Sequence, residues 1–158
     1  MNLAKLFSTQ KALRDRIDYN GTDRLDKLEL ALLVEVGECA NEWRGFKFWS
    51  TDQKSRKKPL LVEYVDGFHF VLELGIEIEV DYDEWEFTPI VSYDITKKFT
   101  DVFESIIDFK QFPVESEWVD VYEHYLGLGE MLGFSRREVE NAYFEKNKIN
   151  HQRQADGY

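Results

Sequence analysis

The stretch ALLVEVGECA, residues 31–40, decides the fold together with a similar stretch, LLVEYVDGFHF, at residues 60–70. Both are strongly apolar, and side chains three positions apart share one face of a helix. Each stretch carries two carboxylates at that spacing: Glu35 and Glu38 in the first, Glu63 and Asp66 in the second. Carboxylates are costly to remove from water, so carboxylates in such apolar sequence need a neutralising partner.

Helical periodicity extends outward from these stretches in both directions. Apolar residues at helical spacing predict helices over residues 2–18, 23–43 and 59–80, with Pro59 at the first helical position. The acidic, aromatic run at 81–89 predicts a loop, and residues 90–109 mix strand-like alternation with a helical pattern. Pro113 predicts the start of a further helix, and Ser135 with Glu138 has the spacing of a capping box before a last one. The helices outnumber any strand signal, so we expect an all-α helical bundle.

Composition narrows the class of protein further. The length of 158 residues predicts a single domain spanning residues 1–158, with a sizeable core. The net charge of −11 opposes general binding to nucleic acid or to an anionic membrane. No apolar run is long enough to span a bilayer, and Cys39 is the only cysteine, which excludes an intrachain disulfide and fits a reducing compartment. We therefore expect a soluble, cytoplasmic protein.

The two carboxylate pairs predict a metal site. Twenty-four residues separate Glu38 from Glu63, enough for two antiparallel helices that bring all four carboxylates together. Four such groups repel one another unless cations neutralise them. Hard divalent cations take oxygen ligands, and Mg²⁺ commonly binds carboxylates together with substrate phosphates. One cysteine and three histidines argue against zinc. The alternative interpretation of each pair is an ordinary solvated helix face.

His69 lies three residues after Asp66 in a pattern related to the ExxH motif of di-iron bundles. Those bundles need that motif on two helices, and Asn41 occupies the corresponding place after Glu38. We therefore interpret His69 as a hydrogen-bonded histidine of the core or its rim rather than as a metal ligand.

ALLVEVGECANEWRGFKFWS, followed by EYVDGFHF, resembles the all-α dimeric dUTPases, relatives of the MazG-type nucleoside triphosphate pyrophosphohydrolases. The closing run YFEKNKINHQRQADGY resembles the end of the same family. The resemblance implies a four-helix metal-binding core, a homodimer and Mg²⁺-dependent cleavage of dUTP to dUMP and pyrophosphate. It assigns Mg²⁺ to Glu35, Glu38, Glu63 and Asp66, and it gives Glu35 the further role of orienting the attacking water.

The carboxyl-terminal run supplies the positive charge that the acidic pairs lack. Lys146 and Arg153 are seven apart, two helical turns, so they lie near one face of a continuous helix. Arginine binds two phosphate oxygens at once, and Asn147 and Asn150 offer amides to sugar or phosphate. An ordinary basic helix end is the alternative, but beside the four carboxylates we favour binding of the triphosphate.

Selection of the base is assigned by resemblance alone. It places Gln10 near the base, and it implies that an aromatic side chain of FKFW, either Phe48 or Trp49, stacks on the uracil. Lys47 lies between Phe46 and Phe48 in this run and can reach a phosphate. Either Phe48 or Trp49 could instead belong to the core.

Two other functions compete with the dUTP diphosphatase. One keeps the fold and the chemistry but changes the base, as in a dCTP or broad nucleotide pyrophosphohydrolase. The other is a non-enzymatic interaction protein that uses the helical dimer as a binding surface. The closing run YFEKNKINHQRQADGY and Gln10 argue against the first alternative, and the set of four carboxylates argues against the second.

Overall fold

The structure is a computed structural model that describes residues 1–157, so Tyr158, the last residue of the closing motif, lies outside it. Over this range the chain forms six α-helices, one 3₁₀ turn and no strand, which confirms the all-α class. The elements are α1 (Leu3–Ile17), α2 (Arg24–Trp43), α3 (Lys57–Glu77), η1 (Tyr82–Glu84), α4 (Ile95–Gln111), α5 (Glu115–Met131) and α6 (Arg136–Ala155). None of the helices within residues 1–157 is long and apolar enough to cross a membrane.

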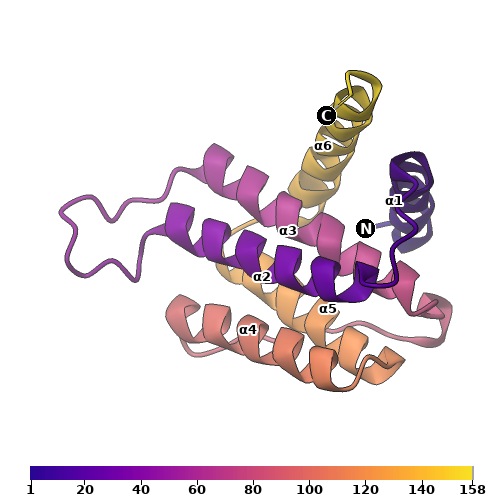
Figure 1. The fold of residues 1–158 in the computed structure, drawn as a ribbon. Coiled ribbons are helices and arrows are strands. Elements are labelled where there is room, and N and C mark those ends of the chain that lie inside the picture. The colour runs from indigo at the N-terminus through magenta and orange to yellow at the C-terminus, as the bar shows by residue number, and fades with distance from the viewer. Residues whose placement is uncertain (158) are drawn as a thin grey trace.

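The helices arrange in two groups around α3 (Figure 1). Helices α2 and α3 lie side by side and run antiparallel, as the two carboxylate stretches predict. Helices α4 and α5 pack against one side of this pair, while α1 and α6 pack against α3 on the other. The loop 44–56 projects from the end of the α2–α3 pair that is far from α1.

Two helix starts differ from the sequence-based expectation. α3 begins at Lys57, so Pro59 lies within its first turn rather than at its first position. α5 begins at Glu115 after Pro113, which precedes the helix instead of opening it. Proline fits either place because the first turn of a helix does not need its N–H groups. The capping box of α6 is present as predicted.

The segment 90–109, which the sequence leaves ambiguous, forms an extended stretch over residues 90–94 and then most of α4. The backbone N–H of Ile90 donates to the carbonyl of Glu123 at 3.1 Å, so the segment before α4 lies across α5 instead of joining a sheet. Ile90 and Ser92 are half-buried, whereas Val91 and Tyr93 between and after them are exposed. Asp94 then caps α4 by accepting from the N–H of Lys97. The alternating pattern thus reflects an extended segment with one face on a helix, which has the same period as a strand.

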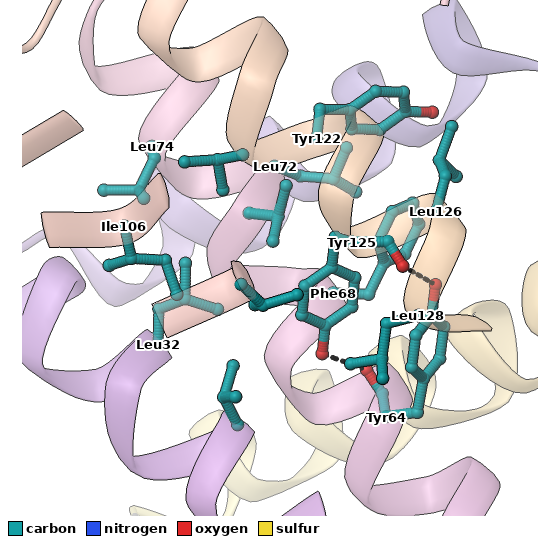
Figure 2. Packing of buried hydrophobic residues seen from close by; sticks show 14 of the residues in the cluster. Leu32, Tyr64, Phe68, Leu72, Leu74, Ile106, Tyr122, Tyr125, Leu126 and Leu128 are labelled. Atoms are coloured by element: carbon teal, nitrogen blue, oxygen red, sulfur yellow. Dashed lines mark hydrogen bonds between the residues drawn. The ribbon is translucent and has the colours of Figure 1, made fainter. Parts of the chain in front are cut away.

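The core fixes α3 against α5 through a pair of buried tyrosines (Figure 2). The hydroxyl of Tyr64 donates to the carbonyl of Tyr125 at 3.0 Å, and the hydroxyl of Tyr125 donates to the carbonyl of Tyr64 at 2.8 Å. Phe68 packs beside them, fully buried. A Cβ at Gly67 would lie 2.2 Å from the Tyr125 hydroxyl oxygen, so glycine permits this approach. The opposite face of α3 is thereby held toward α1, α2 and α6.

Candidate functional site

A cavity of about 500 Å³ lies where α1, α2, α3 and α6 meet. Its walls are largely apolar, and its polar groups come from all four helices. Pockets of this kind and size are the usual sites for small ligands. Half of the twelve residues that the sequence singles out line it: Gln10, Glu35, Asp66, Lys146, Asn150 and Arg153.

At one end of this pocket, α2 and α3 bring together three carboxylates. Oxygens of Glu35, Glu63 and Asp66 lie within 4.8 Å of one another, and all three side chains are half-buried. The antiparallel packing of the two helices produces this cluster, because Glu63 and Asp66 are one turn apart on α3 and lie opposite Glu35 of α2. Glu38 is exposed one turn further along α2 and lies outside this group of three.

The acidic end carries more negative charge than its surroundings neutralise. Burial, and then the charges of Asp66, Glu38 and Glu63, raise the pKa of Glu35 to about 7. Burial, and then the charges of Asp66, Glu38 and Glu42, also raise the pKa of Glu63. The ammonium of Lys146 lies 2.5 Å from an oxygen of Asp66 and opposes both shifts. One lysine therefore leaves an excess of charge that a further cation would relieve.

The donor set at this end fits a hard divalent cation. All three groups are carboxylates, which suit Mg²⁺ better than softer metals. Cys39, the one cysteine, is buried, and burial raises the pKa of its thiol, so it stays protonated and is a poor metal ligand.

In the middle of the pocket, Gln10 is held from both sides. Its Nε2 donates to Glu73 Oε1 at 2.7 Å, and the hydroxyl of Tyr143 donates to its Oε1 at 2.8 Å. All three side chains are buried, and they come from α1, α3 and α6. The glutamine predicted near the base is therefore a fixed part of the wall rather than a mobile surface group.

His69 lines the same part of the pocket and stacks on Tyr143, with ring centroids 4.3 Å apart. Its Nδ1 lies 2.8 Å from the carbonyl oxygen of Val65, which only accepts, so Nδ1 carries the hydrogen. Burial lowers the pKa of His69 to about 4, which keeps the ring neutral and leaves Nε2 as an acceptor. Nε2 is buried and has no hydrogen-bond partner among residues 1–157. The hydrogen-bonded rim histidine expected from sequence is present, with one nitrogen left for a ligand.

At the far end of the pocket the carboxylates are paired with arginines. Arg14 reaches Glu73 at 3.4 Å and also bonds Glu77, and Arg24 lies 3.5 Å from the same oxygen of Glu77. Sequence reasoning missed Glu73 and both arginines, because the partners lie more than fifty residues apart along the chain. The signal available was Glu73 itself, which stands in the apolar run after His69.

The remaining predicted residues lie elsewhere. Lys47, Phe48 and Trp49 are on the loop 44–56 and do not line this pocket. Lys47 and Trp49 border a separate shallow depression, and Phe48 is 85% exposed. Asn147 is buried on α6 beside the pocket-lining residues, and within the described chain its amide nitrogen has no hydrogen-bond partner. Glu42, which is not one of the predicted site residues, lies one turn beyond Glu38 and is paired with Arg56 of the loop, at 3.1 and 3.2 Å.

Comparison with known proteins adds a family to this geometry. A search of curated proteins found no match for the chain. The profile of the dUTPase family matches residues 2–158, nearly the whole sequence. The match covers the helices that line the pocket as well as the acidic cluster between α2 and α3. The chain therefore belongs to the all-helical dUTPase family, and this membership identifies it as a hydrolase of the dUTP diphosphatase class.

Proposed function

We propose that the chain, as one domain over residues 1–158, cleaves dUTP to dUMP and pyrophosphate with Mg²⁺ at the acidic end of the pocket. The observation that carries the proposal is the group of Glu35, Glu63 and Asp66, whose oxygens lie within 4.8 Å of one another beside a cavity large enough for a nucleotide. Glu38 completes the proposed ligand set from the next turn of α2. Bound Mg²⁺ would neutralise the charge that develops on the phosphate oxygens.

Glu35 is the proposed general base. A carboxylate at the edge of the metal site can take a proton from a water molecule held beside it. The carboxylate would accept a proton from a water molecule as the water oxygen bonds to phosphorus. The bond between the attacked phosphorus and the oxygen that bridges the α and β phosphates breaks, and the bridging oxygen keeps the electron pair. Attack at the α phosphorus thus expels pyrophosphate, and attack at the β phosphorus expels dUMP.

The tail helix α6 supplies the cations for the phosphate chain. Lys146, Asn150 and Arg153 line the pocket along one face of α6, with Lys146 directly at the acidic end. In this proposal Lys146 moves from Asp66 to a phosphate oxygen once substrate and metal are present. Charge-assisted hydrogen bonds from these side chains orient the chain for attack. Asn147, whose amide nitrogen has no hydrogen-bond partner within residues 1–157, is proposed to bind substrate from the adjacent position.

Gln10 and His69 are the residues proposed to recognise the base through hydrogen bonds. The amide of Gln10 offers an N–H, and Nε2 of His69 offers an acceptor. Uracil presents carbonyl acceptors beside the N3–H donor and can satisfy both. Cytosine presents an unprotonated N3 and an amino group. Its amino donor would meet the N–H donor of Gln10, and its N3 acceptor would meet the acceptor of His69. Sites built on such hydrogen bonds reject the wrong partner strongly.

The homodimer and the cytoplasmic location are also part of the proposal. Apolar side chains lie exposed on α2, where Leu30 is 63% and Val34 is 49% exposed, and a second copy of the chain would cover them. Lys47, Phe48 and Trp49 remain predicted substrate contacts. That contact requires either that the loop 44–56 moves or that a second copy presents its own loop to this pocket.

A nucleotide panel tests the function. Purified protein is incubated with Mg²⁺ and each of dUTP, dCTP, dTTP, dATP and dGTP, and the products are separated. We expect dUTP to be cleaved to dUMP and pyrophosphate in equal amounts, with the other nucleotides slower by at least about a hundredfold. Equal cleavage of dCTP would favour the related pyrophosphohydrolase of different specificity. Absence of cleavage with every nucleotide would favour the interaction protein.

A further inference from the structure

We propose that Glu73 is a positioning residue for base specificity, acting by fixing which end of the Gln10 amide faces the ligand. The inference rests on the proposed contact between Gln10 and the base. Glu73 touches neither the acidic end nor, in this proposal, the nucleotide. It acts through Gln10.

The two ends of a carboxamide are almost identical in shape, and they differ only in hydrogen bonding. If Gln10 turned over, the pocket would receive a carbonyl acceptor in place of an N–H donor. Such a site would suit the amino group of cytosine rather than a carbonyl of uracil. The orientation of this amide therefore has consequences for which base fits.

Glu73 decides the orientation because an ionised carboxylate only accepts hydrogen bonds. Its Oε1 is 2.7 Å from Gln10 Nε2, an arrangement that the reversed amide, with its oxygen there, could not keep. Tyr143 cannot decide alone, because its hydroxyl both donates and accepts. The same hydroxyl lies 3.4 Å from the carbonyl oxygen of Leu6, a second acceptor. Glu73 therefore fixes the orientation of the Gln10 amide, and the Tyr143 hydroxyl turns to match it.

Burial raises the pKa of Glu73, and the nearby Arg14 opposes that shift and favours the charged form that this role requires. Arg14 Nη1 lies 3.4 Å from Glu73 Oε2, the oxygen that does not bond Gln10. Arg14 is itself held by Glu77, which Arg24 also contacts. A glutamine at position 73 could bond Gln10 equally well in either orientation, so a buried charge with its own arginine is needed only if one orientation matters.

The test compares kcat and KM for dUTP and dCTP, with Mg²⁺, in the wild type and in Glu73→Gln. We expect the ratio of kcat/KM for dUTP over dCTP to fall at least about tenfold, the scale of one hydrogen bond. The loss should lie mainly in KM, since the reacting phosphate is untouched. Glu77→Gln is the matched control: it removes a carboxylate one turn along α3 from the same arginine network but does not contact Gln10. It should leave the ratio unchanged.

A second pair of variants separates positioning from a merely structural effect. Gln10→Ala should lower the ratio by itself, and adding Glu73→Gln to it should lower the ratio no further. Tyr143→Phe should lower the ratio less than Glu73→Gln. Thermal unfolding midpoints of all variants show whether the fold is kept.

Three results would overturn the inference. If Gln10→Ala lowers the ratio while Glu73→Gln leaves it unchanged, Glu73 does not set the amide, and the proposed base contact stands. If Tyr143→Phe lowers the ratio more than Glu73→Gln, the tyrosine sets the amide instead. If Gln10→Ala leaves the ratio unchanged, the proposed base contact fails together with the inference that rests on it.

Discussion

The carboxylates at the two ends of the pocket have opposite electrostatic surroundings, although α3 supplies carboxylates to both ends. At the acidic end, Glu63 and Asp66 of α3 lie close to Glu35, and Lys146 opposes the raised pKa of Glu35. At the far end, about two to three turns beyond Asp66 along α3, Glu73 and Glu77 are paired with Arg14 and Arg24. Burial raises the pKa of Glu73 as it does that of Glu35, but there the neighbouring arginines oppose the shift.

From this difference we infer two roles: the carboxylates of the acidic end take part in the reaction, and those of the paired end hold neighbouring side chains in place. A carboxylate whose countercharge is built into the chain is already satisfied, so it can hold a neighbour such as Gln10 in place. Carboxylates that lack a countercharge leave folding free energy to be recovered by a bound cation. The comparison predicts that changes at the acidic end affect the reaction itself, whereas changes at the paired end affect binding and selection.

The largest effect is expected from Glu35→Gln. Glutamine keeps the size of the side chain but cannot accept the proton from water, so turnover of dUTP should fall by about a hundredfold to ten-thousandfold. Steady-state hydrolysis with Mg²⁺ measures this, and circular dichroism should show unchanged helix content. Hydrolysis within a few-fold of the wild type would remove Glu35 from the proposed reaction.

A smaller loss is expected from Lys146→Met, which keeps the apolar stem and removes the charge. The phosphate chain would lose one charge-assisted hydrogen bond, and kcat/KM for dUTP should fall by about tenfold to a hundredfold. Lys148→Met, an exposed lysine two residues along α6, is the matched control and should change kcat/KM by less than about twofold. Equal losses in both variants would mean that only general charge matters.

The pH dependence of stability tests the uncompensated charge without any assay of activity. Below its ordinary pKa of 4.5, Glu35 is protonated in both the folded and the unfolded chain. Between 4.5 and about 7 the unfolded chain releases this proton while the folded protein retains it, so stability from this group falls as pH rises. In the absence of divalent metal, the unfolding midpoint of Glu35→Gln minus that of the wild type should therefore increase across this window. A difference that stays constant with pH would contradict the raised pKa.

The smallest effect is expected from Glu42→Gln. Glu42 lies one turn beyond Glu38 on α2, but its carboxylate is paired with Arg56, a partly exposed ion pair. Such pairs contribute about 0–1 kcal/mol, so both stability and dUTP hydrolysis should change little. A loss of activity comparable to that of Glu35→Gln would extend the metal site one turn further along α2.

The sequence predicts much of the fold because local signals agree with the packing. The apolar periodicity of α1 to α3 and the Ser135–Glu138 capping box require no knowledge of distant residues, and both are confirmed. The extended segment before α4 could not be assigned, because it lies on α5, more than thirty residues away along the chain, and not beside another strand. The i,i+3 spacing likewise indicated the face that Glu63 and Asp66 share.

The base end of the pocket was less accessible to sequence reasoning. Gln10 could be named by resemblance, but the contacts that fix it join α1 to α3 and α6 over distances of 63 and 133 residues along the chain. The free nitrogen of His69 depends on which carbonyl its other nitrogen meets. The direction in which the loop 44–56 projects depends on tertiary packing, so its aromatic residues could be named but not placed.

Calorimetric titration of Mg²⁺ into the nucleotide-free wild type, Glu63→Gln and Glu77→Gln tests the central claim most directly. Both variants remove one carboxylate from α3, Glu63 from the acidic cluster and Glu77 from the pairs with arginine. We predict that the wild type and Glu77→Gln bind Mg²⁺ alike and that Glu63→Gln binds it at least about tenfold more weakly. Unchanged binding in Glu63→Gln, or an equal loss in Glu77→Gln, would contradict the assignment of the metal to the uncompensated carboxylates.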